Sequence, residues 1–102
     1  MIYANHIGYS DVNPFEVVRY VSLKTLDIRE MVATEKSWMR QFMAGGFLGH
    51  VVNQEDQDWD IQPDPEAPVI RIRKRKDGKW YDSHGARYAL AEKPVKFHDF
   101  NF

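Results

Sequence analysis

The segment Val69–Ser83, VIRIRKRKDGKWYDS, constrains the fold more than any other part of the chain. Isoleucine and arginine alternate from residue 70 to residue 73. Asp77-Gly78 follows, which is a typical pair for a two-residue type I′ hairpin turn because both central residues of that turn need positive φ. With this turn, Arg75 pairs with Trp80 and Arg73 with Asp82. The sequence therefore predicts a β-hairpin.

The alternation assigns each side chain of this hairpin to one face. The charged face is expected to carry Arg71, Arg73, Arg75, Trp80 and Asp82. The other face is expected to carry Ile70, Ile72, Lys74 and Tyr81. We expect the isoleucines to enter a core and the arginines to point away from it.

The three arginines form a ladder whose neighbours lie within about 7 Å of each other on one sheet face. Asp82 can balance one charge, and Trp80 can stack on another guanidinium. The remaining charge can bind an anion, because the guanidinium fork grips phosphate at two points. Two interpretations stay open, a phosphate site and an ordinary solvated strand.

The whole chain, residues 1–102, is expected to be a single domain with a modest core. Its net charge of −1 means that any nucleic-acid binding must be local. It has no cysteine, which excludes disulfides and thiol chemistry. No apolar run approaches the ~20 residues that span a bilayer, and the N-terminus lacks the features of a signal peptide, so no membrane partner is expected.

The other segments predict further strands. Residues 15–31 read as a second hairpin joined by Ser22-Leu23-Lys24, with Leu26 and Ile28 on one face and Asp27 and Arg29 on the other. Whether Arg19 shares the face of Arg29 stays open, because the loop leaves the register undefined. An edge strand is expected near the N-terminus, before a turn at residues 11–14.

Three segments complete the expected fold. Residues 34–43 favour a short helix with Thr34 as N-cap, or else a structured loop. Residues 58–68 hold three prolines within six residues and read as a loop. Residues 95–102 read as a terminal strand that closes the sheet or docks onto another subunit. The expected fold class is mainly β: a small antiparallel sheet built from hairpins, with one short helix or helical loop.

A second candidate site lies in residues 45–59, GGFLGHVVNQEDQDW. Phe47 can offer a stacking face, His50 follows it, and Asn53 can read a base edge through its amide. The alternative is that Phe47 belongs to the core and Asn53 caps a loop. The acidic residues at 55–60 lack the spacing of a calcium-binding EF-hand loop and read as a solvated loop.

No residue pattern predicts catalysis. No serine lies in a nucleophile elbow, no pair of histidines has metal-ligand spacing, and no phosphate-binding glycine motif is present. We therefore expect no enzyme activity, no catalytic residue, no metal and no cofactor. A hydrolase assembled in space from His50, His84 and a carboxylate is the remaining alternative.

Four stretches carry a resemblance to known proteins: residues 13–31, 45–59, 71–81 (RIRKRKDGKWY) and 96–102 (KFHDFNF). Together they resemble a family of small phage-encoded anti-defence proteins, the first type of Thoeris anti-defence protein. The resemblance implies a small β-rich homo-oligomer, a dimer or higher, in the cytoplasm of the infected bacterial host. It also implies that the protein sequesters a cyclic ADP-ribose isomer or a cyclic oligonucleotide without cleaving it, and so acts as a sponge for an immune signal.

Such a ligand needs aromatic faces for its base, amides for the base edge and guanidiniums for its phosphates. The side chains expected to bind it are Phe47, His50, Asn53, Arg19, Arg29, Arg71 and Arg73. The alternative function is a phage inhibitor that binds a host protein or a nucleic acid through the arginine-rich hairpin.

Overall fold

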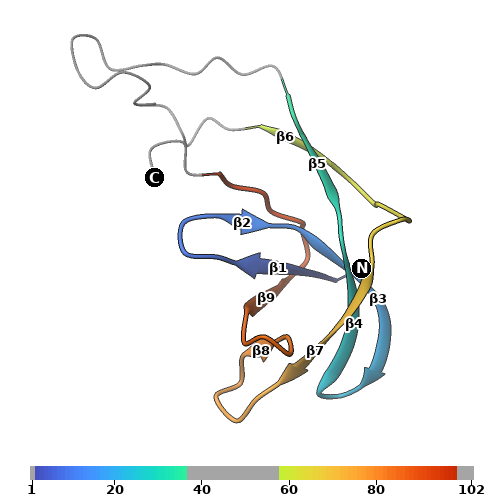
Figure 1. Ribbon diagram of the computed structural model, residues 1–102, viewed down its shortest axis with the longest axis vertical. Coiled ribbons are helices and arrows are strands. Elements are labelled where there is room, and N and C mark those ends of the chain that lie inside the picture. Colours follow the sequence, from blue (N-terminus) through green and yellow to red (C-terminus); the bar gives the residue numbers. More distant parts are fainter. Residues whose placement is uncertain (1, 37–57, 99–102) are drawn as a thin grey trace, which may run out of the picture.

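The computed structural model describes residues 2–36 and 58–98, and all regular secondary structure in these two ranges is β-strand (Figure 1). This confirms the predicted mainly β fold. Thr34 and Glu35 were predicted to begin a helix. They belong instead to a strand, because they pair with Asp60 and Trp59, which lie far away in the sequence. Lys36 follows this strand without helical structure, and its N–H donates to the Asp58 carbonyl at 2.9 Å, while residues 37–43 of the predicted helix lie outside the described residues.

In the described part of the chain, seven strands pair in one antiparallel sheet. In spatial order they are β2 (Val12–Asn13), β1 (Tyr3–Ile7), β3 (Phe15–Ser22), β4 (Thr25–Glu30), β7 (Val69–Lys74), β8 (Trp80–Tyr81) and β9 (Arg87–Ala91). Strand β9 also pairs with β1 along its whole length, from Tyr3↔Ala91 to Ile7↔Arg87. The sheet therefore closes on itself into a small barrel, which leaves few open edges.

Strand β1 is central in this barrel, and the prediction of an N-terminal edge strand was wrong. It is bordered by β9 on one side and by β2 and the start of β3 on the other. Strands β2 and β3 continue one another across Pro14, which has no N–H to donate to the ladder. The turn lies at residues 9–10, where the Gly8 N–H donates to the Asp11 carbonyl at 2.9 Å, rather than at residues 11–14.

The predicted hairpin at residues 15–31 is present as β3 and β4. Its loop is shorter than expected, because Ser22 pairs directly with Thr25. Leu26 and Ile28 are buried, as the alternation predicts. Two register shifts interrupt β3, between Val17 and Arg19 and again before Ser22.

The core lies inside the barrel. Its buried side chains are Ala4, Leu26, Ile28, Ile72 and Tyr88, which come from β1, β4, β7 and β9. Partly buried neighbours, among them Phe15 and Trp80, pack against this cluster, and the rings of Phe15 and Tyr88 meet edge to face at 5.3 Å. Burial of Ile72 confirms that the apolar face of β7 points inward.

Two further strands form a separate ribbon, β5 (Val32–Glu35) and β6 (Trp59–Gln62), which leads away from the barrel (Figure 1). The predicted loop at residues 58–68 therefore begins with a strand, and only residues 63–68, which contain the prolines, run as a loop. Met31 separates β4 from β5, and its N–H donates to the Pro14 carbonyl at 3.0 Å.

The C-terminal segment is fastened to the barrel by Asn5, a buried polar side chain. Its Nδ2 donates to the Lys93 carbonyl at 3.1 Å, and its Oδ1 accepts from the Val95 N–H at 2.9 Å. The predicted terminal strand is reduced, within the described residues, to one bridge between Phe97 and Val12. This bridge places the segment against β2.

Candidate anion-binding groove

The predicted arginine hairpin is present as β7 and β8, but its register differs by one residue. Arg73 pairs with Tyr81 and Lys74 with Trp80. The Gly78 N–H donates to the Arg75 carbonyl and the Arg75 N–H to the Lys79 carbonyl, both at 2.9 Å. The loop therefore has three residues, and only its Gly78 has positive φ, at 80°. This is a type I turn followed by a glycine bulge rather than a type I′ turn.

The altered register moves Trp80 to the opposite face, because a slip of one residue reverses every side chain of a strand. Trp80 packs against the core, and Tyr81 takes its expected place beside the arginines. The Arg75 guanidinium lies 4.4 Å from the centre of the Tyr81 ring. The Tyr81 hydroxyl donates to Asp77 Oδ2 at 2.5 Å, which raises the pKa of Tyr81 and lowers that of Asp77.

The outer face of the sheet brings together the predicted arginines of both hairpins. Arg19 lies opposite Asp27, and Asp27 lies opposite Arg71, so these three residues form a row across β3, β4 and β7. Arg29 and Arg73 lie on the same face, because they stand two residues away from Asp27 and Arg71. The four arginines expected to bind ligand therefore share one surface.

Two of these arginines are paired with carboxylates of the same face. Arg71 grips Asp27 at two points, Nε to Oδ1 at 2.8 Å and Nη2 to Oδ2 at 3.3 Å. This contact lowers the pKa of Asp27 and raises that of Arg71. Arg29 lies 3.5 Å from Glu16, with only 23% and 15% of the two side chains exposed.

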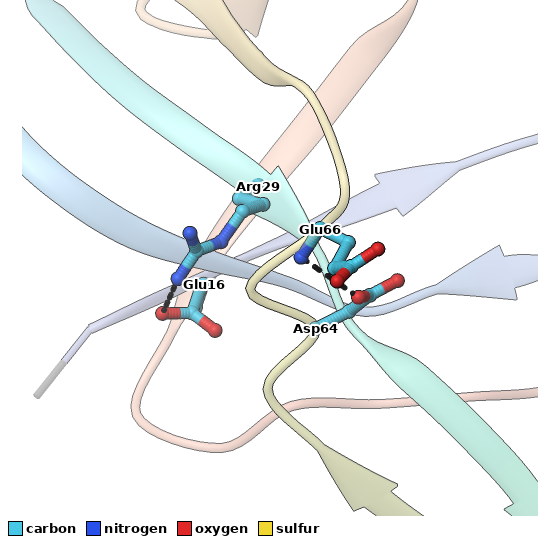
Figure 2. Close-up of polar contacts among 4 residues, drawn as sticks. All are labelled: Glu16, Arg29, Asp64 and Glu66. Carbon is cyan, nitrogen blue, oxygen red and sulfur yellow. Dashed lines mark hydrogen bonds and ion pairs between the residues drawn. The ribbon is translucent and has the colours of Figure 1, made fainter.

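Figure 2 shows Arg29 directed at Glu16, with the turn that contains Asp64 and Glu66 in the same region of the molecule. The Glu66 N–H donates to Asp64 Oδ1 at 3.1 Å and so holds that turn together. Among the described residues, Arg29 Nε and Glu16 Oε2 are buried without a hydrogen-bond partner. The charge of Arg29 is balanced within the face, so Arg29 contributes little positive charge to a ligand.

A groove of about 690 Å³ lies beside β7. Its lining residues are Ile70, Arg71, Arg73, Lys74, Arg75, Tyr81, Asp82, Ser83 and His84. Consecutive residues of β7 point to opposite faces, yet residues of both orientations line this groove. The groove therefore runs along the edge of β7, between that strand and the segment 81–84, rather than over one face of the sheet.

Asp82 supplies the carboxylate of the groove wall, and hydrogen bonds occupy it. Its Oδ1 accepts from the N–H groups of His84 at 2.8 Å and Ala86 at 3.0 Å, and its Oδ2 accepts from the Tyr88 hydroxyl at 3.0 Å. Burial favours a higher pKa for Asp82, but these hydrogen bonds outweigh it and lower the pKa. The prediction that Asp82 balances one charge of the arginine ladder is therefore wrong.

The lining carries more positive than negative charge. Arg71, Arg73, Lys74 and Arg75 contribute four cations against the one carboxylate of Asp82. Within residues 2–36 and 58–98, neither Arg73 nor Arg75 forms a salt bridge with a carboxylate. The groove can therefore bind an anion without first displacing an internal partner from these two side chains.

The sequence identified part of this groove. Arg71 and Arg73 were predicted, but Lys74, Tyr81, Ser83 and His84 were not, and the correct turn type would have placed Tyr81 beside the arginines. Phe47, His50 and Asn53 lie outside the described residues. Within the described part of the chain, no group of three His, Asp or Glu side chains has the arrangement of a metal site.

Comparison with known proteins adds no relative. No protein-family model, curated protein or solved structure matches the chain. A helix long and apolar enough to cross a membrane is absent from the described residues.

Proposed function

We propose that this protein binds a phosphate-bearing cyclic nucleotide signal in the groove beside β7 and holds it without cleaving it. The observation that carries the proposal is the cationic lining, in which Arg73 and Arg75 form no salt bridge with a carboxylate among the described residues. The volume of about 690 Å³ lies within the range of small-molecule sites.

The lining supplies the chemistry that a phosphate ester needs. Guanidinium groups bind phosphate oxygens at two points and do not lose their charge near neutral pH. Arg75 is held in place by its stacking on Tyr81, and Arg71 by its two contacts with Asp27. Side chains that are already positioned lose less conformational entropy when a ligand binds.

The resemblance to Thoeris anti-defence proteins supplies the identity of the proposed signal, a cyclic ADP-ribose isomer or a cyclic oligonucleotide. The protein would then act as a homo-oligomer in the cytoplasm of the infected bacterium, where it competes with the receptor of the signal. Competition of this kind requires tight binding rather than turnover.

Calorimetric titration with a panel of cyclic ADP-ribose isomers and cyclic di- and trinucleotides tests this proposal. The bound ligand is then recovered by heat denaturation and identified by chromatography. We expect saturable binding to one member of the panel and recovery of that ligand unchanged. Recovery of an altered ligand would indicate an enzyme, and no binding to any member would reject the proposal.

The variant Arg73→Ala tests the position of the site. Loss of one charge-assisted contact is expected to weaken binding by roughly 10- to 100-fold. Lys93→Ala is the matched control, because it also removes one exposed positive charge but lies outside the groove lining. Equal affinities of the two variants would move the site away from β7.

A second candidate function is the binding of an acidic protein or a nucleic acid, which would use a wider surface. Positive side chains also gather at the adjoining ends of the two hairpins, with Lys24 in one turn and Lys76 and Lys79 around the other. The Lys74 N–H donates to the Lys24 carbonyl at 2.9 Å, so the two turns lie side by side. Affinity for a nucleic acid would fall steeply with salt.

A further inference from the structure

Among the described residues, the first half of β7 has a strand neighbour on one side only. The Lys74 N–H donates to the Lys24 carbonyl, and Ile72 and Ile70 continue this pairing with β4. Because the backbone groups of successive strand residues point to alternate sides, the odd-numbered residues of β7 face away from β4. Arg75 and Arg73 use this other side to pair with β8.

Strand β8 ends too early to cover the rest of that side. It stops at Tyr81, and the chain turns back at residues 82–86, where the Asp82 N–H donates to the Ala86 carbonyl at 3.0 Å. Val69 and Arg71 therefore direct their N–H and C=O groups away from β4 without a strand partner among the described residues. An exposed ladder of this kind is a template for an added strand.

The groove along this edge selects for negative charge. A strand added beside β7 places every second side chain on the outer face, about 4.5–5.5 Å from the side chain opposite to it. On that face it lies opposite Val69 and Arg71, with the long side chain of Arg73 diagonally within reach, and on the inner face it meets Ile70. The chemistry that fits is an extended segment in which acidic and apolar residues alternate.

The other exposed edge of the barrel is less suited to strand addition. Among the described residues, the second half of β3 pairs only with β4, and it exposes Tyr20 and Val21. Its two register shifts disrupt the regular spacing of backbone donors and acceptors, a feature that protects edges from pairing. Residues 69–73 of β7 pair with β4 in an unbroken register, so their free side is regular as well.

We propose that the edge of β7 at Val69–Arg71 binds an extended acidic peptide of a partner protein as an added strand. The proposal goes beyond nucleotide binding and does not depend on it, because the main chain of β7 supplies the specific contacts. The two ligands would nevertheless exclude each other, since both need Arg73 in the same groove.

Fluorescence anisotropy with a labelled eight-residue peptide of alternating glutamate and valine tests the proposal. Two further peptides carry backbone N-methyl groups on either the glutamates or the valines, which removes donors from one side of the strand and leaves the charge unchanged. Strand addition predicts that one methylated peptide loses about tenfold or more in affinity and the other stays within about twofold.

The direction of the loss is informative. In antiparallel pairing the residues opposite Val69 and Arg71 also turn their backbone groups toward β7, so the peptide with methylated glutamates is the one that loses affinity. In parallel pairing methylated valines do so. Equal affinity of both methylated peptides, or no binding of the parent peptide, would overturn the proposal, and the first of these outcomes would indicate contact through charge alone.

Protein variants separate this proposal from the nucleotide proposal. Arg73→Ala is expected to weaken the parent peptide about tenfold, and Lys93→Ala is expected to leave it unchanged. If the protein binds a cyclic nucleotide but does not bind the peptide, strand addition alone is rejected. Peptide binding without any nucleotide binding would remove the nucleotide proposal alone.

Discussion

At the scale of single residues, Asp82 has the largest set of hydrogen bonds found in the groove. One carboxylate holds the N–H groups of His84 and Ala86 and the hydroxyl of Tyr88, and so ties the turn after β8 to β9 and to the core. Asp82→Ala leaves these donors without their partner and is expected to lower the free energy of unfolding by about 1–3 kcal/mol. Urea denaturation measures it, with Ser83→Ala as a neighbouring exposed control. Equal stability of the two variants would contradict this role.

The lowered pKa of Asp82 also predicts how this contribution depends on pH. A carboxyl whose pKa is depressed by folding stabilises the protein fully above its unfolded pKa, near 3.8, and loses that contribution as the pH falls through the folded value. The stability difference between the natural protein and Asp82→Ala should therefore be constant from pH 7 to about pH 5 and shrink toward pH 2. Urea denaturation at several pH values measures it, and a difference that grows in acid would reject this assignment.

The sequence predicts the residue types of the groove better than their partners. The arginines of β7 were identified from alternation alone, because their spacing is local. Their partners were not, since Asp27 lies 44 residues from Arg71 and meets it only after β4 and β7 pair. Asp82 was expected to balance the charge of one of these arginines, but it accepts hydrogen bonds from the N–H groups of His84 and Ala86 in its own turn.

At the scale of elements, the β7–β8 hairpin separates what a turn sequence determines from what packing determines. Asp77-Gly78 correctly predicts a turn, but it fits both a two-residue type I′ loop and a three-residue loop that ends in a glycine bulge. The choice between them decides whether Trp80 or Tyr81 faces the core. Trp80 packs against the core, and the sequence of the turn contains no information about this long-range contact.

Gly78 gives this element a testable requirement. Its φ is +80°, and a Cβ at this position would meet no atom within 4 Å, so substitution costs only conformational energy. Gly78→Ala is expected to lower the free energy of unfolding by about 1–2 kcal/mol, and Gly78→Asn by less, because asparagine tolerates left-handed backbone. Thermal and urea denaturation measure both. A Gly78→Ala protein as stable as Gly78→Asn would contradict the left-handed backbone at this position.

At the scale of the whole molecule, the sequence predicted local hairpins but not how they close. The pairing of β1 with β9 joins Tyr3 to Ala91, which no local pattern reports. The ribbon of β5 and β6 was missed for a related reason. Its strands are short, and β6 borders a proline-rich loop that dominates the sequence pattern there. The predicted helix at residues 34–43 lost its first two residues to this ribbon.

The division into barrel and ribbon predicts two levels of local stability. The buried core residues all belong to barrel strands, whereas a two-stranded ribbon alone is marginal in water. Amide hydrogens within the ribbon, such as those of Thr34 and Asp60, should therefore exchange with solvent through a smaller opening free energy than those of Ile28 and Ile72. Hydrogen exchange followed by NMR measures both sets in one experiment.

The variant Ile72→Val tests whether the two levels are separate. Removing one methyl group from the fully buried Ile72 is expected to reduce the free energy of barrel opening by about 0.5–1.5 kcal/mol. If the ribbon opens on its own, its amides should keep the exchange rates of the natural protein, because the substitution does not affect that opening. Val32→Ala, on the exposed ribbon, is the reciprocal control and should speed exchange in the ribbon alone. Parallel changes in both sets would mean that ribbon and barrel open together, and the ribbon would then be part of the cooperative unit that positions the β7 groove.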